Sequence, residues 1–336
     1  MPLLFFLPGI LYNVTMLPVI IIAGPTGTGK TAIAVEVARL TGGEIISADS
    51  RQVYKYLDIG TNKEGEWDSA QQLRVASGIP QHLTDLIDPS ETFNAGDFAK
   101  QASSLIAQMR ASGKLPIVVG GTGLYIKALV DGLAPMPRKD PAIRAELQAQ
   151  LSTLGKEHLY NTLKSIDPEA AEKNRDNPQR MIRALEVYRL TGKPITELHR
   201  NTVPSPERFI QFGLLWNNEE LSLRLDERCR KMLDSGMIEE TREVVRKGYP
   251  AHSPGLEGIG YRDVISYLEG KLDRNSLETL MARDTRRYVK RQMTWFKRDE
   301  RIRWLSVRAA TFDPRIIAGQ MQNITDILDK LDKKDR

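Results

Sequence analysis

Short apolar segments rich in valine and isoleucine alternate along the chain with longer segments of helical periodicity. This alternation predicts an α/β fold with a doubly wound parallel sheet, because each helix returns the chain to the edge where the next strand begins. Helices are expected at about 31–40 and 95–112, and strands at 19–23, 44–48, 82–88, 115–119, 210–216 and 302–305. A ligand of such a fold binds at the carboxyl ends of the strands.

The long interval between the fourth and fifth predicted strands has mostly helical periodicity. Proline clusters at 135–137 and 204–206 bound it. Within it, helices are expected at 140–151, 159–164 and 179–191, with a further turn starting at Asp167-Pro168. We therefore expect an all-helical insertion domain at 138–206, within a core formed by 16–137 and 207–312.

The two ends of the chain have their own patterns. Helices at 221–246, 261–268 and 277–296 are expected to pack on the core, and an amphipathic helix and charged tail at 313–336 to follow. Residues 1–18 are apolar, but they lack a basic start, Pro8 and Pro18 would interrupt a helix, and the segment is short for a bilayer. We expect residues 1–15 to be an N-terminal extension without a structural role, with translation beginning at Met16; a targeting segment is the alternative.

The composition, with 41% hydrophobic and 27% charged residues in 336, is typical of a soluble globular protein. The single cysteine, Cys229, excludes an intrachain disulfide and a cysteine-rich zinc site. It suits a reducing compartment. We expect a cytoplasmic monomer without membrane association.

Positive charge is concentrated in one window near the C-terminus. Residues 281–303 contain nine Lys or Arg and three acids, a net charge of +6. The whole chain has a net charge of +5, so the residues outside this window sum to −1. This concentration predicts a surface that meets a polyanion, with Lys290 and Arg291 as candidate contacts to a nucleic-acid backbone. A solvated helix face without a partner is the alternative.

A glycine-rich motif follows the first predicted strand and opens the first predicted helix. It has the form G-x-x-x-x-G-K-T and consists of Gly24, Pro25, Thr26, Gly27, Thr28, Gly29, Lys30 and Thr31. Its backbone N–H groups and the helix N-terminus bind phosphate oxygens, Lys30 adds a positive charge, and the Thr31 hydroxyl can hold Mg²⁺. A simple glycine turn before a helix is the alternative.

Two further strand ends carry candidate chemistry. Asp49 follows the second strand, where a carboxylate can act as a general base or can cap the next turn. The fourth strand ends in Gly120-Gly121 without an acid, although nucleotide hydrolases and kinases of the usual kind hold magnesium with an acid there. The N–H groups of this glycine turn and the Thr122 hydroxyl can meet a second ligand, or the glycines can simply allow a tight turn.

Seven blocks in the chain together resemble the tRNA dimethylallyltransferases, also called isopentenyl-tRNA transferases. They are GPTGTGKT (24–31), DSRQVYKYLDIGTNK (49–63), GGTGLYIKAL (120–129), NPQRMIRALEVYRLTGKP (177–194), RLDERCRKM (224–232), GIGYRD (258–263) and TRRYVKRQMTWF (285–296). The resemblance implies a P-loop NTPase-like fold. It also implies transfer of a dimethylallyl group from its diphosphate to N6 of adenosine 37, beside the anticodon of tRNA.

The resemblance also implies roles for individual residues. Asp49 would be the general base, Gly27–Thr31 would hold the diphosphate with Mg²⁺ on Thr31, Arg228 would bind the diphosphate, and Thr122 would contact the substrates. Lys30 joins this catalytic set. Contacts to tRNA are implied for Asp49, Ser50, Arg51, Gln52, Thr122, Arg144, Gln179, Arg180, Met181, Ile182, Arg183, Gly258, Ile259, Gly260, Tyr261 and Arg262.

Three other functions remain open from the residues. A free-nucleotide (adenylate) isopentenyltransferase would share the core, but it would not need an RNA-sized basic surface. A small-molecule P-loop kinase would transfer phosphate from ATP, which the missing strand-end acid disfavours. A non-enzymatic RNA-binding module would need neither the phosphate loop nor Asp49.

Overall fold

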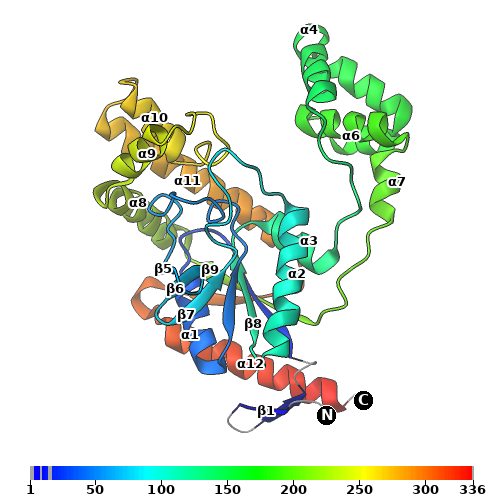
Figure 1. The fold of residues 1–336 in the computed structure, drawn as a ribbon. Coiled ribbons are helices and arrows are strands. Elements are labelled where there is room, and N and C mark those ends of the chain that lie inside the picture. Colours follow the sequence, from blue (N-terminus) through cyan, green and yellow to red (C-terminus); the bar gives the residue numbers. More distant parts are fainter. Residues whose placement is uncertain (1–3, 8–9, 14–16, 335–336) are drawn as a thin grey trace. The chain divides into compact units, whose positions relative to one another are not determined.

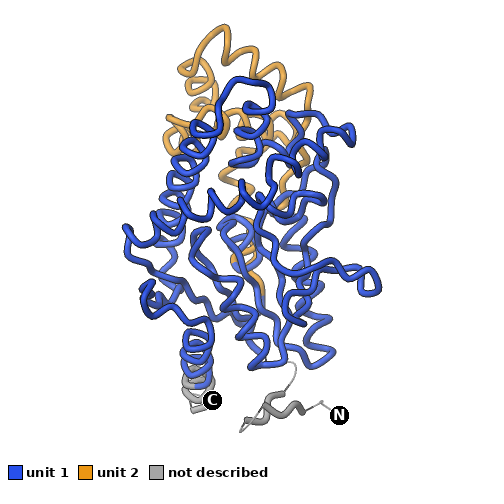
Figure 2. The backbone as a smooth tube through the Cα atoms, turned by 90° about the vertical axis from the view of Figure 1, so that its left-hand side faces the viewer, with its two compact units in different colours: residues 1–130, 206–336 blue, residues 131–205 orange. Residues whose placement is uncertain are grey.

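The computed structural model describes residues 4–7, 10–13 and 17–334 (Figure 1). The described chain divides into two compact units: unit 1 comprises Met1–Val130 and Pro206–Arg336, and unit 2 comprises Asp131–Ser205 (Figure 2). Unit 2 thus begins before the predicted boundary at 138. The connecting segment packs within unit 2, because Arg183 donates to the Pro137 carbonyl oxygen and a Cβ on Gly132 would lie 2.1 Å from the Val203 oxygen.

The described residues of unit 1 contain an eight-stranded sheet with the order β10-β9-β3-β8-β4-β7-β6-β5. The strands from β10 to β7 pair in parallel, and β6 and β5 continue the sheet antiparallel. Their bounds are β3 Val19–Ala23, β4 Glu44–Ser47, β5 Glu66–Asp68, β6 Leu73–Ala76, β7 Ile79–His82, β8 Pro116–Gly120, β9 Phe209–Trp216 and β10 Ile302–Val307. The sheet is therefore dominated by parallel pairs, as expected.

The third predicted strand, at 82–88, was wrong in position. The strand in that place is β7, which ends at His82. Leu83 and Asp85 have φ values of 62° and 54°, which extended strands do not adopt, so the chain turns there. The antiparallel strands β5 and β6 were not predicted.

Helices cover both faces of the sheet, as the side chains of β3 require (Figure 1). Ile20 and Ile22 point to one face and pack with residues of α1 (Lys30–Thr41) and α12 (Pro314–Lys334). Val19 and Ile21 point to the other face and pack with α2 (Ala95–Ala111) and α3 (Gly123–Asp131). This two-residue alternation in a fully buried strand produces the doubly wound arrangement.

Four further helices of unit 1 form a separate layer. They are α8 (Asn218–Asp234), α9 (Met237–Arg246), α10 (Tyr261–Leu268) and α11 (Arg274–Phe296). They share an apolar core with Val53, Tyr54 and Leu57, which lie in the segment after β4. This core fixes that segment against α8 and α11, the helices that matter for the site.

Unit 2 is all-helical and has its own apolar core. It contains α4 (Pro141–Ile166), α5 (Pro168–Lys173), α6 (Pro178–Thr191) and α7 (Ile195–Arg200). The first three begin with proline behind a capping Asp140, Asp167 or Asn177, whose side chain accepts backbone N–H bonds of the first turn. Gly155 has non-helical angles inside α4, so the two helices predicted at 140–151 and 159–164 meet there.

Near the start of the chain, β1 (Leu4–Leu7) and β2 (Ile10–Asn13) pair antiparallel. The predicted translation start at Met16 lies outside the described residues. Within residues 4–7, 10–13 and 17–334, no helix is both long and apolar enough to cross a membrane.

Candidate active site

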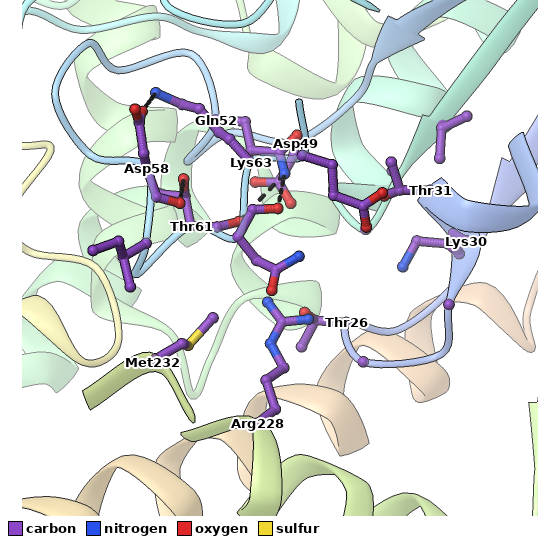
Figure 3. Close-up of a pocket in the computed structure, with 18 of the residues that line it drawn as sticks. Thr26, Lys30, Thr31, Asp49, Gln52, Asp58, Thr61, Lys63, Arg228 and Met232 are labelled. Carbon is purple, nitrogen blue, oxygen red and sulfur yellow. Dashed lines mark hydrogen bonds and ion pairs between the residues drawn. The ribbon is translucent and has the colours of Figure 1, made fainter. Parts of the chain in front are cut away.

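A cavity of about 710 Å³ opens at the carboxyl ends of β3, β4 and β8. Its walls come from the phosphate loop at 24–31, the segment at 49–65, the end of β8 and one side of α8. Lys30, Asp49 and Arg228, which sequence analysis selected from three separate blocks, line it together. Figure 3 shows Lys30 entering from the start of α1 and Arg228 from α8.

Hydrogen bonds within the phosphate loop and packing against Phe312 hold it in place. Thr28 Oγ1 and Lys30 Nζ both donate to the Pro25 carbonyl oxygen, at 2.9 and 2.6 Å. Gly29 has φ +85°, and a Cβ there would lie 2.4 Å from the Phe312 ring, so the position requires glycine. The loop residues that line the cavity are Thr26, Gly27, Gly29, Lys30 and Thr31, whereas Gly24, Pro25 and Thr28 do not.

Lys30 is 9% exposed. Burial lowers the pKa of its ammonium to about 7; the negative charge of Asp49 opposes this shift and the positive charge of Arg228 adds to it. An anion bound beside Lys30 would stabilise the charged form. Basic residues outnumber acidic ones in the lining of the cavity, as suits a phosphate ligand: Lys30, Lys63, Arg74, Arg224, Arg228 and Lys231 stand against Asp49, Asp58, Glu64 and Glu227.

Two arginines one helical turn apart on α8 face this cavity. Burial lowers the pKa of Arg228, while Asp49 and Glu64 act in the opposite direction. Arg224 Nε donates to the Gly27 oxygen at 2.7 Å, and its guanidinium lies 5.2 Å from the ring centres of Trp216 and Phe312. Sequence analysis missed Arg224, although its spacing of four residues from Arg228 in a predicted helix was a signal for it.

Asp49 both caps a turn and faces the cavity. Its Oδ1 accepts the Arg51 N–H at 2.8 Å, so the two roles weighed for this carboxylate coexist. Oδ2 accepts no hydrogen bond from the described residues. Thr122 bonds to Ser50, the residue after Asp49: Thr122 Oγ1 accepts the Ser50 N–H at 2.9 Å and donates to Ser50 Oγ at 3.2 Å. Thr122 itself does not line the cavity.

The segment at 57–65 forms another wall of the cavity, and hydrogen bonds from Gln52 and to Glu240 hold its backbone in place. Gln52 Nε2 donates to the backbone oxygens of Thr61 and Asn62 at 3.3 and 3.2 Å. Glu240, on α9, accepts the N–H groups of residues 58, 59 and 60 at 2.8, 2.8 and 3.3 Å. Gln52, which the family resemblance implied as a tRNA contact, thus supports the wall of this cavity.

Four charged side chains form ion pairs with one another in this wall, and three of them, Asp58, Lys63 and Arg74, line the cavity. Lys63 Nζ lies 2.8 Å from Asp58 and 2.5 Å from Asp85, and Arg74 lies 2.9 and 3.1 Å from the same two carboxylates. The side chain of Lys63 is fully buried. Glu64, the next residue, lines the cavity, and burial raises its pKa while Arg228 opposes the rise. Sequence analysis did not find Glu64.

The charge of Asp49 acts on two tyrosines. Burial, followed by the charge of Asp49, raises the pKa of Tyr288 on α11 to about 12. Burial raises the pKa of Tyr125 on α3 further, and its hydroxyl donates to the Phe93 oxygen at 3.0 Å. Both phenols therefore stay neutral; Tyr125 is buried against Phe98, and neither tyrosine lines the cavity.

The basic residues of α11 lie on different faces of the helix. Arg291 is placed over the Tyr288 ring, 5.6 Å from its centre. Lys290 instead lines a separate groove with Trp216, Leu221 and Met293. Part of the predicted basic surface is neutralised, because Arg286 pairs with Asp226, and Arg283 and Arg287 pair with Asp284.

Gln292, also on α11, is the main residue that sequence analysis missed. It is 6% exposed. Its Oε1 accepts the Thr26 N–H at 3.0 Å, and its Nε2 donates to the Gly121 oxygen at 2.8 Å. The only sequence signal was its place within a block matched to the family.

Further implied tRNA contacts in unit 1 lie near Arg51. Arg51 Nη1 donates to the Pro254 oxygen at 2.8 Å, and a Cβ on Gly258 would lie 3.3 Å from Arg51 Cδ. Tyr261 is 1% exposed and its hydroxyl donates to Glu240, so its side chain is a core residue and not an RNA contact. Arg262 is exposed and pairs with Asp284 at 2.6 Å.

In unit 2, the implied contacts separate into core and surface. Met181 and Ile182 are 0% and 1% exposed and belong to the apolar core, so burial excludes their side chains as RNA contacts. Gln179 and Arg180 are exposed. Arg144 and Arg183 are partly exposed, and both bond to the fully buried Glu186, at 3.1 and 2.7 Å.

A magnesium ion fits this cavity through oxygen ligands. The Thr31 hydroxyl and the carboxylates of Asp49 and Glu64 line it, and Mg²⁺ prefers oxygen together with substrate phosphates and water. Within the described ranges, no cluster of three or more His, Cys, Asp or Glu side chains could hold a metal alone. The donor set therefore suits an ion that arrives with a phosphate ligand.

Comparison with known proteins gives consistent matches. The family model described as IPP transferase matches residues 52–299, and that described as isopentenyl transferase matches residues 17–75. The chain is 46% identical to the tRNA dimethylallyltransferase of Endomicrobium trichonymphae, over 84% of this chain and 92% of that protein. It is 41% identical to that of Acetivibrio thermocellus, over 89% and 95%.

Solved structures agree with these matches. The full-length tRNA isopentenylpyrophosphate transferase from Bacillus halodurans has a TM-score of 0.66 and 34% identity, covering 94% of this chain and 99% of that one. A eukaryotic dimethylallyltransferase acting on tRNA has a TM-score of 0.76 and 28% identity, with 94% and 80% covered. The chain belongs to the IPP transferase family, the family of the tRNA dimethylallyltransferases.

Proposed function

We propose that this protein transfers a dimethylallyl group from dimethylallyl diphosphate to N6 of adenosine 37 in tRNA and releases diphosphate. The observation that carries the proposal is the meeting of Lys30, Arg228 and Asp49 in one cavity. Lys30 and Arg228 can stabilise the negative charge of a departing diphosphate, and Asp49 can accept the proton that the acceptor amine must lose.

The donor would bind with its diphosphate on the phosphate loop. N–H groups of Gly27–Thr31, together with Lys30 and Arg228, would stabilise the negative charge that grows as the allylic carbon–oxygen bond breaks. Arg224, which bonds to the Gly27 oxygen, supports this loop. Thr31 would hold Mg²⁺, which supplies charge stabilisation to the leaving diphosphate.

The acceptor would be deprotonated by Asp49. The adenine N6 forms a bond to the allylic carbon as the bond between that carbon and the diphosphate oxygen breaks, with its electron pair going to the diphosphate. The N6 proton passes to Asp49 Oδ2, because Oδ1 is occupied by the Arg51 N–H. The neutral ring of Tyr288, which is only partly exposed, would help exclude water, which competes with the amine for the allylic carbon.

The RNA would be held by polar and basic side chains that are exposed or partly exposed, and by the loop at 258–260. We retain this role for Ser50, Arg51, Arg144, Gln179, Arg180, Arg183, Gly258, Ile259, Gly260, Arg262, Lys290 and Arg291, with Thr122 positioning the loop of Asp49. We propose that the protein acts in the cytoplasm as a monomer. The target base must leave its stack to reach a recessed carboxylate, at a cost of a few kcal/mol.

Incubation with three acceptors tests the proposal. Each reaction contains enzyme, Mg²⁺ and dimethylallyl diphosphate, with an anticodon stem-loop carrying adenosine 37, the same stem-loop with guanosine 37, or AMP. Mass spectrometry should find one added five-carbon unit on the adenosine stem-loop alone. Prenylation of AMP in preference to RNA would assign the free-nucleotide reaction instead. A parallel reaction with ATP in place of dimethylallyl diphosphate tests the kinase reading: phosphorylation of AMP there, with no prenylation of any acceptor, would assign a kinase.

A further inference from the structure

One buried amide joins two loops that are far apart in the sequence. Gln292 lies 266 residues from Thr26 and 171 from Gly121 along the chain, yet it bonds to the backbone of both. Thr26 belongs to the phosphate loop, and Gly121 to the glycine turn after β8. α11 therefore contacts the donor loop and the neighbouring turn through a single side chain.

The two bonds require a side chain that both accepts and donates, as an amide does. The Thr26 N–H can only donate and the Gly121 carbonyl can only accept, so the side chain between them must accept with one atom and donate with the other. Glutamate as a carboxylate lacks the donor, and methionine lacks both groups. The fit is also close: a Cβ on Gly121 would lie 2.4 Å from Gln292 Nε2.

The glycine turn continues the connection toward Asp49. Thr122, next to Gly121, accepts the Ser50 N–H at 2.9 Å, and its own N–H donates to the Ala48 oxygen at 3.2 Å. Ala48 and Ser50 flank Asp49. The phosphate loop and the proposed base are thus joined through Gln292, Gly121-Thr122 and the backbone around Asp49.

We propose that Gln292 is a positioning residue that fixes the phosphate loop relative to Asp49. Its amide would set the distance between the departing diphosphate and the carboxylate that receives the N6 proton. Reacting groups displaced by about 1 Å can lose about 10²-fold in rate. The inference rests on the proposed function, and inorganic pyrophosphate provides a ligand that tests the loop without prenyl transfer.

The experiment compares Gln292→Met and Gln292→Glu with Val289→Ala. Met keeps the length of the side chain and removes both hydrogen bonds, whereas Val289→Ala removes buried apolar volume one turn earlier on α11. Thermal unfolding, pyrophosphate affinity, KM for the stem-loop and kcat are measured for each. Gln292→Met should lower kcat by about 10–100-fold and weaken pyrophosphate binding, with little change in KM for RNA. Val289→Ala should lower the unfolding temperature with kcat within about twofold of wild type.

The Glu variant separates positioning from simple packing. A protonated carboxyl can donate to the Gly121 oxygen and accept from the Thr26 N–H, whereas the carboxylate repels that oxygen. The ratio of Gln292→Glu kcat to wild-type kcat should therefore rise as pH falls from 8 toward 5, and taking the ratio cancels the pH effects that the two enzymes share. This readout stands even if Gln292→Met does not fold.

Two results would overturn the proposal. One is a folded Gln292→Met variant with wild-type kcat and wild-type pyrophosphate affinity. The other is a pH-independent activity ratio for Gln292→Glu. Failure of the proposed function looks different: the wild-type protein would bind pyrophosphate, with the loss in Gln292→Met intact, but would prenylate no RNA.

Discussion

Lys30 Nζ donates to the carbonyl oxygen of Pro25, five residues earlier in the same loop, at 2.6 Å. The ammonium is buried there and has a pKa lowered to about 7. The hydrogen-bond partner of the Lys30 amine is thus a backbone oxygen of its own loop. A diphosphate would replace or share that partner, which leads to a measurable proton change.

Binding of dimethylallyl diphosphate at pH 8.5 should take up close to one proton. Lys30 is mostly neutral at that pH in the free protein, because its pKa is about 7, and the bound anion raises the pKa so that the amine becomes charged. Calorimetric titrations in buffers of different ionisation enthalpy measure the uptake. The uptake by Lys30 should vanish below about pH 6, where its amine is already charged in the free protein.

Lys30→Arg is the matched control for this uptake. It keeps a positive charge but does not titrate in this range. An uptake at pH 8.5 that is equal in Lys30→Arg and wild type would assign the proton to another group.

Removal of Glu186 should destabilise unit 2. Its fully buried carboxylate accepts the Asp140 N–H at 2.8 Å and pairs with Arg144 and Arg183. Glu186→Ala leaves these partners without their acceptor, and we expect a loss of about 1–3 kcal/mol in the free energy of unfolding, together with weaker RNA binding. Urea unfolding followed by circular dichroism checks the first effect, and filter binding the second.

Glu197→Ala provides the comparison in the same unit. Glu197 pairs with Lys193 on the surface, with side chains 49% and 58% exposed. Such a pair contributes about 0–1 kcal/mol, so this variant should unfold almost like wild type. Equal losses for both variants would contradict the anchoring role of Glu186.

Arg291→Ala should affect binding of an anticodon stem-loop more than Lys290→Ala. Arg291 shares a face of α11 with Tyr288, whose pKa responds to Asp49, whereas Lys290 lines a separate groove. Removing one cation that neutralises an RNA phosphate should lower the salt slope of binding by about 0.7–0.9. Affinities measured between 50 and 200 mM salt give this slope for each variant. A larger change for Lys290→Ala would mean that the RNA follows the other face of the helix.

Local patterns were enough to predict the parts of the site that lie within one segment. The strand at 19–23, the phosphate loop and its helix follow from hydrophobicity and glycine spacing, and β3 begins and ends at the predicted residues. The bonds from Gln292 to Thr26 and Gly121 could not be predicted in this way. Helical periodicity indicates which face of α11 is buried, but it does not say which loops that face will meet.

The errors in the predicted strands have equally local causes. Leu83 and Asp85 adopt left-handed backbone angles without being glycine or asparagine, so composition gave no warning that β7 ends at His82. Asp85 pairs there with Lys63 and Arg74, and the sequence pattern did not indicate that these residues would meet. The strand β5 is an exposed edge of only three residues, Glu66–Asp68, too short for an alternating pattern.

The central claim, that Asp49 accepts the proton of the attacking amine, is tested most directly by single-turnover kinetics of Asp49→Asn. Enzyme preloaded with dimethylallyl diphosphate and Mg²⁺ is mixed with an anticodon stem-loop, and prenylated RNA is quantified over time. The rate of the chemical step should fall by about 10²–10⁴-fold, while the affinity for RNA stays within about threefold of wild type. A wild-type single-turnover rate in Asp49→Asn would contradict the account, because the amine would then lose its proton without this carboxylate.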